Sequence, residues 1–434
     1  MKFKFTFALL FACLLSFGQK ARIFSGPIVG SVTNNSAKVW IGYYGRGKQI
    51  LVLTDTISNR IFYPSSVSEI RSKKEHRAAI ANFTQLVPGR KYFVVASIEK
   101  GKKNATASFT TLSDSGIHDF SFTLGSCALL ETGFWRGAFP GGSSRIFCQM
   151  EKAHPNFMVW LGDNLYYFKR DYVSYEKMFA RNMNIRAKFS RLRHFLSSTP
   201  QYAIWDDHDY GPNDSGKDWN KKDTSLLVFK HFWPNTYPHK EQLNGNYFSY
   251  QQYDAEFFMM DNRSFRDEPC DTCAFLGETQ LVWLKNKLQI SDATFKFIAI
   301  GTQVLNANGF GESYEQYKKE HNDLINFITQ SNIKGVVFLT GDKHYSEVCK
   351  RMINDYPVYD FTCSPITTPA LPRKLLGAYY NADRISGTDY AKKNFGKISI
   401  SGEKGNRIAK IEVFSNGGKL KRTLTIPANE LQRK

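Results

Sequence analysis

Short apolar runs that end abruptly in polar side chains recur along the chain after residue 113. These runs predict buried strands, and the amphipathic segments between them predict helices. Strands that alternate with helices are typical of a layered domain, in which helices cover the faces of a sheet. The predicted strands are 120–127, 157–161, 202–205, 257–260, 295–300 and 336–339, and the predicted helices are 144–154, 172–193, 276–288 and 314–330.

The segment before residue 113 has a different pattern. Between residues 22 and 112, short alternating runs are separated by Gly, Asn, Asp and Pro turns, of which Pro88-Gly89 is the clearest. About seven such strands predict a small immunoglobulin-like β-sandwich. It contains no cluster of catalytic residue types, so we expect a structural module. The C-terminal tail adds three β runs, with a hairpin turn at Asn416-Gly417-Gly418.

Residues 1–18 have the pattern of a secretory signal peptide. Two lysines precede an apolar core, and Ser16 and Gly18 form a small-x-small cleavage site. We favour export with cleavage over a lipoprotein anchored at Cys13, because apolar residues continue after that cysteine. No later segment is long and apolar enough to predict a transmembrane helix. The expected domains are a signal peptide (1–18), an N-terminal β-sandwich (19–113) and a mixed helix and sheet domain (114–434).

Composition and charge narrow the classes of function. Of the 434 residues, 42% are hydrophobic and 15% are aromatic, which excludes a disordered protein. The formal net charge of +19 becomes +17 when the two lysines of the expected signal are subtracted. A basic surface attracts anions such as phosphate esters, nucleotides or lipid head groups. The sequence has neither zinc-finger spacing nor a basic helix, which argues against sequence-specific nucleic-acid binding.

The cysteines are too few for a disulfide-based scaffold in a chain of this length. Cys270 and Cys273 form a CxxC motif. In an exported protein this motif could close a local disulfide, or the two residues could simply lie near each other.

Metal-binding side chains directly follow several of the predicted strands. Cys127, Asp163, the group 206–209, and Asp342 with His344 each come at the end of an apolar run. Ligands in layered α/β domains bind at the carboxyl ends of the strands, so we expect these side chains to converge there. A buried carboxylate is costly without a partner, and a cation is the strongest partner. A thiolate and a phenolate suit a ferric ion, and carboxylates suit Ca²⁺, Mg²⁺ or Mn²⁺. The sequence therefore predicts a site for two or more cations.

Several motifs together resemble the binuclear metallophosphoesterases, and most closely the PhoD-like alkaline phosphatases. The main motifs are GDNLYY (162–167), WDDHDYGPND (205–214) and TGDKHYS (340–346), and the supporting ones are GSC (125–127), DNRSFR (261–266) and LGETQLVWL (276–284). The resemblance covers almost the whole mature chain. It implies an α+β fold, in which an immunoglobulin/fibronectin-like β-sandwich precedes a four-layer α/β/β/α metallophosphoesterase domain.

The resemblance also implies roles for individual residues. His208 would stabilise the transition state or protonate the leaving oxygen without binding metal. Asp163 would bridge the cations, and Tyr166 would be the tyrosine ligand that purple acid phosphatases also use. The full set of implied metal ligands is Cys127, Asp163, Tyr166, Asp207, Asp342 and His344.

Two departures from the broader family favour oxygen ligands. Asp207 stands where that family has Asn, and Asp342 stands where it has His. The resemblance therefore implies Fe³⁺ with Ca²⁺, with Mg²⁺, Mn²⁺ or Zn²⁺ as alternatives at the second site. Asn164, Asp206 and Arg263 are further candidates for contacts with metal or substrate. Asp206 could equally cap a turn, and Arg263 could equally form a structural pair with an aspartate.

The combined interpretation is an exported, metal-dependent phosphoesterase of the alkaline phosphatase D type, in which a metal-activated hydroxide attacks phosphorus. One alternative is a phosphodiesterase or phospholipase that cleaves lipid or polymer diesters. Another, from a different class, is a non-catalytic surface-binding protein that uses the β-sandwich for attachment. We expect a monomer with a phosphate-ester substrate, either kept in the periplasm or released.

Overall fold

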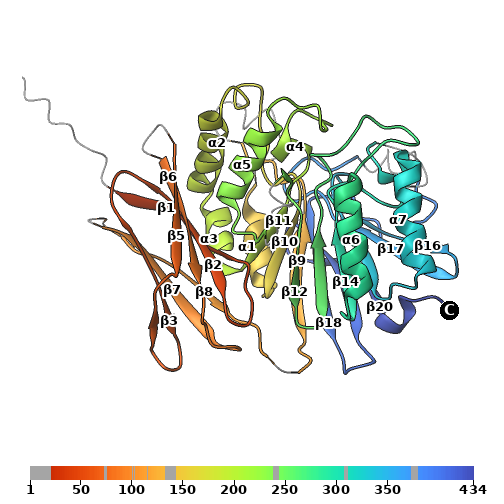
Figure 1. Cartoon of the computed structure of the whole chain (residues 1–434), viewed down its shortest axis with the longest axis horizontal. Coiled ribbons are helices and arrows are strands. Elements are labelled where there is room, and N and C mark those ends of the chain that lie inside the picture. The colour runs from red at the N-terminus through yellow and green to blue at the C-terminus, as the bar shows by residue number, and fades with distance from the viewer. Residues whose placement is uncertain are drawn as a thin grey trace, which may run out of the picture.

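In a computed structural model of the chain, residues 21–72, 76–99, 101, 103–114, 116–131, 143–237, 244–306, 311–372 and 380–434 are described. The expected signal peptide and Cys13 lie outside these residues. The described part combines helices with several β-sheets, and a β-rich region occupies its N-terminal side (Figure 1).

Eight short strands form two four-stranded antiparallel sheets in the N-terminal region, one more strand than the sequence pattern predicted. The strand orders are β1-β2-β6-β5 and β4-β3-β7-β8. Alternate residues of both sheets point into a shared apolar core, as in Tyr92 and Val94 of one sheet and Val39 and Ile41 of the other. The strands are β1 (Arg22–Gly30), β2 (Ala37–Tyr44), β3 (Gln49–Asp55), β4 (Ile61–Phe62), β5 (Ser66–Arg71), β6 (His76–Phe83), β7 (Lys91–Ile98) and β8 (Ala105–Thr110).

The rest of the chain contributes two six-stranded sheets and their helices. The strand orders are β11-β10-β9-β18-β19-β20 and β12-β13-β14-β15-β17-β16. The strands are β9 (Phe120–Gly125), β10 (Phe157–Leu161), β11 (Gln201–Ile204), β12 (Phe248–Gln252), β13 (Ala255–Met259), β14 (Phe295–Ala299), β15 (Val336–Thr340), β16 (Glu347–Ile353), β17 (Tyr356–Thr362), β18 (Asn394–Ser401), β19 (Ile408–Ser415) and β20 (Leu420–Pro427). The helices are α1 (Arg145–Lys152), α2 (Tyr175–Lys188), α3 (Ser190–Ser198), α4 (Asp207–Tyr210), α5 (Lys222–Phe232), α6 (Glu278–Ile290) and α7 (Lys318–Gln330), with 3₁₀ turns η3 (Tyr314–Gln316) and η4 (Ala428–Glu430).

Each large sheet contains a block of neighbouring parallel strands. Strands β9, β10 and β11 run in one direction in the first sheet, and β13, β14, β15 and β17 do so in the second. Every parallel strand of a sheet therefore ends at the same edge, and the polar residues that follow these strands gather there. The sheets are in contact through aromatic side chains, since the Phe122 ring lies 5.0 Å from that of Phe257 and 5.4 Å from that of Phe297.

Helices cover the remaining faces of these sheets. Residues of α1, α2, α3 and α5 share an apolar cluster with Trp160 of β10, and residues of α6 and α7 share another with Phe338 of β15. In Figure 1, α2 and α5 lie between the N-terminal strands and the large sheets, whereas α6 and α7 lie on the opposite side. Each large sheet thus has the other sheet on one face and helices on the other, and this packing fixes the positions of the strand ends.

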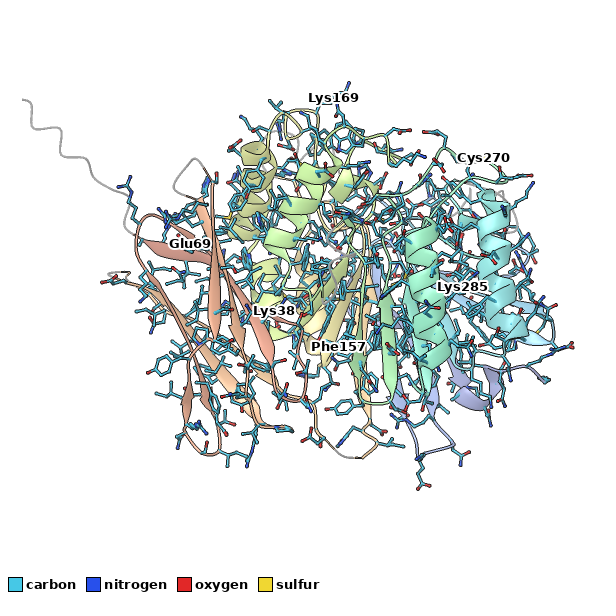
Figure 2. All side chains as sticks on the ribbon, viewed as in Figure 1. Lys38, Glu69, Phe157, Lys169, Cys270 and Lys285 are labelled. Carbon is cyan, nitrogen blue, oxygen red and sulfur yellow. A yellow bond between two sulfur atoms is a disulfide. The ribbon has the colours of Figure 1, made fainter. Side chains whose placement is uncertain are left out.

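One sheet of the N-terminal region is docked on this assembly. Trp40 of β2 is fully buried and donates from its indole nitrogen to the carbonyl of His231 at 2.8 Å. Lys38, labelled in Figure 2, donates to the carbonyl of Asn235 at 2.9 Å. The guanidinium carbon of Arg186 lies 4.9 Å from the centre of the Trp40 ring. These contacts tie β2 to the helices α2 and α5.

The sequence predicted one helix over 172–193, but the structure has two helices there, so that prediction is wrong in this respect. Phe189 ends α2 with a non-helical ψ of 88° and precedes α3. Likewise, the segment 314–330 divides into a 3₁₀ turn and α7 at Tyr317. A periodic apolar pattern continues through such a break because the buried side of both pieces faces the same core.

Two expectations about local chemistry have clear outcomes. Cys270 and Cys273 form a disulfide in an exposed loop, with Cα atoms 5.1 Å apart (Figure 2). No helix within the described residues is long and apolar enough to cross a membrane.

Candidate functional site

Four of the predicted site residues have a backbone conformation that non-glycine residues rarely adopt. The φ angles are 58° at Cys127, 53° at Asp163, 65° at Asp342 and 58° at His344. Left-handed backbone of this kind costs free energy and persists where the surrounding structure enforces it, often at functional sites. Each residue lies two to four positions after a parallel strand, so the chain turns sharply there and directs polar groups to the same edge.

Gly162 allows two of these strand ends to approach each other. Its φ is 93°, and a Cβ atom at this position would lie 2.5 Å from the Cβ of Asp206. A larger residue would therefore push the end of β10 away from the end of β11. The glycine of the sequence Gly-Asp-Asn thus has a packing function as well as a turn function.

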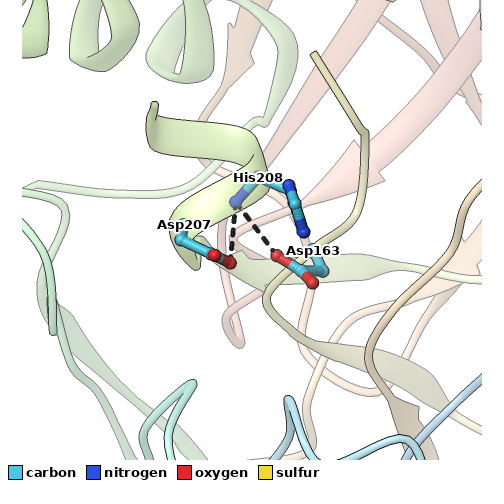
Figure 3. A group of neighbouring side chains, drawn as sticks. All are labelled: Asp163, Asp207 and His208. Atoms are coloured by element: carbon cyan, nitrogen blue, oxygen red, sulfur yellow. Dashed lines mark hydrogen bonds between the residues drawn. The ribbon is translucent and has the colours of Figure 1, made fainter. Parts of the chain in front are cut away.

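Asp163 is at the centre of the group of predicted ligands. Its carboxylate accepts hydrogen bonds from the Tyr166 hydroxyl at 2.8 Å and from the backbone N–H of His208 at 3.1 Å. The Cys127 thiol lies 3.6 Å from its Oδ2 atom. The same N–H of His208 also reaches Asp207 Oδ1 at 2.9 Å (Figure 3). Asp163, Asp207 and His208 each offer a ligand atom, and these atoms lie within 4.8 Å of one another.

The protonation of this group reflects its burial. Burial and the nearby charge of Asp207 raise the pKa of Asp163 well above its usual value. Burial also opposes ionisation of Asp207, but the charge of His208 and the N–H of Asp214 hold the pKa of Asp207 below its usual range. The pKa values of these two carboxyls are therefore shifted in opposite directions. Burial, together with the charge of Asp163, raises the pKa of both Cys127 and Tyr166.

Asp342 and His344 join the site from the second sheet. Their segment follows β15, and the Cys127 thiol lies 3.7 Å from the carbonyl oxygen of Asp342. The contact that joins Asp342 to Cys127 thus runs through its backbone. Burial raises the pKa of the Asp342 carboxyl well above its usual value, with the charge of Lys343 in partial opposition. Burial lowers the pKa of His344 to about 4, so its imidazole is neutral and can act as a ligand.

Arg263 lies in a second acidic group beside the first. It is fully buried, and its Nε donates to Asp206 Oδ1 at 2.6 Å. Its other nitrogens reach Glu312, at 3.1 Å from Nη1 and 2.5 Å from Nη2. Arg266 also forms an ion pair with Glu312. The guanidinium of Arg263 is therefore occupied by two carboxylates of the protein itself.

Asn164 and Asp206 each keep one buried oxygen without a partner. The amide nitrogen of Asn164 donates to the carbonyl of Ile204 at 2.7 Å, but its Oδ1 has no hydrogen-bond partner among the described residues. The same holds for Oδ2 of Asp206. A buried oxygen without a partner is costly, and a cation, a water molecule or a substrate group would satisfy it.

Two residues of the site were given no individual role from the sequence, namely Asp209 of the group 206–209 and Thr368. Asp209 accepts hydrogen bonds from the backbone N–H groups of Asn164, Leu165 and Asp206, at 3.1, 3.0 and 3.2 Å, and so fixes both strand-end loops. Its position in the sequence Asp-Asp-His-Asp was a usable signal. Thr368 donates to the carbonyl of Cys127 at 2.7 Å, and its Oγ1 lies 3.3 Å from the Tyr166 hydroxyl. No local pattern indicated Thr368, which follows β17.

The donor set fits a metal centre. Asp163, Cys127 and Tyr166 hold protons in close contact, and no cationic side chain of the described residues is paired with them in the way that Arg263 is paired with Asp206. Cations that displace these protons would recover the energetic cost of burying the acids. The combination of carboxylates, a thiol and a phenol is suited to metal ions rather than to a covalent nucleophile.

Comparison with known proteins identifies a family and a similar fold. A family model described as PhoD-like phosphatase matches residues 122–406. The structure of the purple acid phosphatase PPD1 isolated from yellow lupin (Lupinus luteus) seeds is similar to this chain with a TM-score of 0.67. The two are 11% identical, and the alignment covers 92% of this chain and 74% of that chain. At this identity the likeness shows the fold alone.

Part of the chain also aligns with the sensor domain of the anti-sigma factor RsgI4 in Pseudobacteroides cellulosolvens. The identity is 18% over 22% of this chain and 96% of that chain, but the TM-score of 0.18 is too low to carry an argument. No curated protein sequence matches the chain.

Proposed function

The chain belongs to the PhoD-like phosphatase family and is a phosphate-ester hydrolase, and from that premise we propose that it is an exported enzyme with a binuclear or larger metal centre. The observation that carries the proposal is the convergence of Cys127, Asp163 and Tyr166 beside Asp207 at neighbouring strand ends, where no cationic side chain of the described residues pairs with the first three. The family membership gives the class of reaction, and the convergence indicates how this chain would perform it.

We assign Cys127, Asp163 and Tyr166 to a ferric ion, with Asp163 also facing a second cation. Asp207, Asp342 and His344 complete the second position, where carboxylate oxygens favour Ca²⁺, with Mg²⁺, Mn²⁺ or Zn²⁺ as alternatives. The set of six is Cys127, Asp163, Tyr166, Asp207, Asp342 and His344. When bound, such cations supply an activated water and neutralise charge on the phosphoryl oxygens.

Other residues of the chain would donate protons, bind substrate and position the ligands. The imidazole of His208 stacks on the Tyr166 ring, with ring centres 4.1 Å apart, and the stacking holds it beside Asp163. From this position it can donate a proton to the leaving oxygen or a hydrogen bond to the developing charge. The unpartnered oxygens of Asn164 and Asp206 are candidates to bind a cation or substrate. The pairing of Arg263 supports a role in positioning Asp206 rather than in binding phosphate.

We also propose a two-domain organisation and export from the cytoplasm. The large sheets and their helices form the four-layer α/β/β/α catalytic domain over 114–434. The two small sheets form an immunoglobulin/fibronectin-like module over 19–113. The signal peptide directs the chain out of the cytoplasm, to the periplasm or to the medium. The aromatic contacts between the large sheets and the docking of Trp40 support this division.

The test is an assay of the purified mature chain on a chromogenic phosphomonoester and on the matching diester. We expect hydrolysis that is abolished by a chelator and restored by Fe³⁺ with Ca²⁺. The diesterase alternative predicts that the diester is cleaved faster than the monoester. An active protein that is insensitive to chelation after prolonged dialysis would contradict the metal assignment.

A further inference from the structure

The outer faces of the two small sheets differ in their exposure to solvent. The outer face of β1, β2 and β6 is apolar and packs on the helices, where Ile28, Trp40 and Ala78 share a buried cluster with Phe232. The outer face of β4, β3 and β7 also carries several apolar side chains, but these are exposed or partly exposed to solvent. In this molecule, an apolar outer face marks a surface that docks on another surface.

The exposed apolar residues are neighbours across three strands. Ile61 of β4 and Phe93 of β7 both pair with Thr54 of β3, on either side of it. Val52 and Val95 form another pair on the same face. Alternate residues of a strand face the same side, so Ile50 lies in line with Val52. Tyr63 directly follows β4. The exposed fractions are 47% for Ile50, 51% for Ile61, 43% for Phe93 and 72% for Tyr63.

This set, here called the apolar face, comprises Ile50, Val52, Ile61, Phe93 and Val95. The turn between β3 and β4 adds Ile57, which is 68% exposed. Soluble proteins rarely expose several large apolar side chains in one contiguous patch unless the patch binds something.

Cations outnumber acids on the strands and turns that carry the apolar face. The described residues of β3, β4, β7, β8 and their turns include six cations and two acids, and one of the acids, Asp55, is buried and bonded to the N–H groups of Ile57 and Ser58. Lys91 lies on the same side of β7 as Phe93. The cations are Arg46, Lys48, Arg60, Arg90, Lys91 and Lys103.

This charge pattern selects the kind of partner. A second copy of the chain would bring like charges together, since the formal charge of each copy is strongly positive. An anionic lipid surface instead offers phosphates to the cations and an acyl boundary to the aromatic and aliphatic side chains. We propose that the apolar face attaches the protein to an anionic lipid surface. This attachment is independent of the reaction at the strand ends.

The test is sedimentation of the mature, metal-loaded chain with phosphatidylcholine vesicles, prepared with and without phosphatidylglycerol. We expect binding to the anionic vesicles alone. The double variant Ile61→Thr/Phe93→Ser should weaken binding at least tenfold, because both side chains lose their insertion into the lipid boundary. The matched control is Ile290→Thr, a change to a 77% exposed residue at the end of α6, which should leave binding unchanged.

The electrostatic part is tested separately. The variant Arg60→Gln/Lys91→Gln should weaken binding about 30-fold, because each cation near an anionic surface contributes about fivefold. The control Lys319→Gln/Lys421→Gln removes two exposed lysines from other regions and should have little effect. Hydrolysis of a soluble substrate should be unchanged in all four variants, which shows that the fold and the reaction are intact.

Three results would overturn the proposal. The first is equal binding to neutral and anionic vesicles, or no binding to either. The second is unchanged binding of the apolar-face variant, which would indicate adsorption by charge alone. The third is a wild-type dimer in solution that Ile61→Thr/Phe93→Ser converts to a monomer, since the face would then bind a second copy.

Discussion

Two groups of buried acidic side chains lie next to each other at the ends of the parallel strands, and they are neutralised differently. Asp206 and Glu312 share the guanidinium of Arg263, which is fully buried between them. Among the described residues, no cationic side chain pairs with Asp163 in this way, and its neighbours Cys127 and Tyr166 are themselves acids. The first group carries its own cation, and the second has none in the described part of the chain.

The pKa values follow this difference. Burial alone would raise the pKa of Glu312, but Arg263 and Arg266 hold it below its usual value. Burial raises the pKa of Asp206 only to about 6, because Arg263 opposes the effect. Asp163 lacks that opposition, and its pKa is raised well above the usual value by burial and by neighbouring aspartates. A metal centre would therefore neutralise Asp163 and its neighbours, as Arg263 neutralises Asp206.

Removing the central carboxylate should give the largest effect on the reaction. Asp163→Asn should lower kcat by about 10³- to 10⁴-fold, since a lost cation withdraws several kcal/mol of charge stabilisation. Steady-state kinetics on a phosphomonoester measure this, with Asp218→Asn, an exposed aspartate nearby, as the control. Comparable activity of the two variants would remove Asp163 from the site.

Removing the internal cation should instead affect folding. Arg263→Met leaves Asp206 and Glu312 buried without their shared partner, and the expected loss is about 3–5 kcal/mol of the free energy of unfolding. Urea denaturation measures it, and the loss should be the same with and without a chelator. Arg60→Met, which changes an exposed arginine, is the control. If the stability of Arg263→Met depended on bound metal, the two groups would not be separate as described.

A smaller effect on metal affinity or kcat is expected from changing Thr368, whose hydroxyl contacts two of the proposed metal ligands. Thr368 has one proton and donates it to the Cys127 carbonyl, but it can also face the Tyr166 oxygen when that phenol is deprotonated. Thr368→Val should reduce metal affinity or kcat by about tenfold and shift the visible absorption of a tyrosinate ligand. Thr368→Ser, which keeps the hydroxyl, should restore both quantities. A purely structural role for Thr368 would leave the absorption unmoved.

The smallest effect concerns the stability of the metal-free protein. Asp163→Asn should raise it by about 1 kcal/mol at neutral pH, because the variant no longer buries an uncompensated acid. A carboxyl with a raised folded-state pKa stabilises fully below its unfolded value and loses that contribution as the pH rises through the folded value. The gain of Asp163→Asn in chelator should thus grow with pH, and thermal melts from pH 4 upward measure it. A gain that shrank with pH would contradict the assigned direction.

Local sequence patterns were sufficient for the strand-end residues. An apolar run followed by Gly-Asp or by Asp-Asp-His spans only a few residues, so the sequence alone reveals it. The parallel arrangement of strands then brings such ends together. The CxxC disulfide was likewise predictable as one of two outcomes from spacing in the sequence.

The remaining features depend on tertiary contacts. Glu312 lies 49 positions from Arg263, and nothing near either residue indicates their pairing. Thr368 reaches Cys127 across 241 positions of sequence. The left-handed backbone at Asp163 runs against the intrinsic preference of aspartate in general, and only Gly162 before it indicates a sharp turn. The break between α2 and α3 was hidden because both helices bury their apolar residues in the same cluster.

Metal analysis with a visible absorption spectrum of the purified mature protein is the most direct test of the proposed metal centre. We expect iron together with a divalent cation, and a broad visible band from tyrosinate on ferric iron that is lost in Tyr166→Phe while the fold is retained. Colourless protein that binds no metal, and gains no activity from added Fe³⁺ and Ca²⁺, would contradict the proposal.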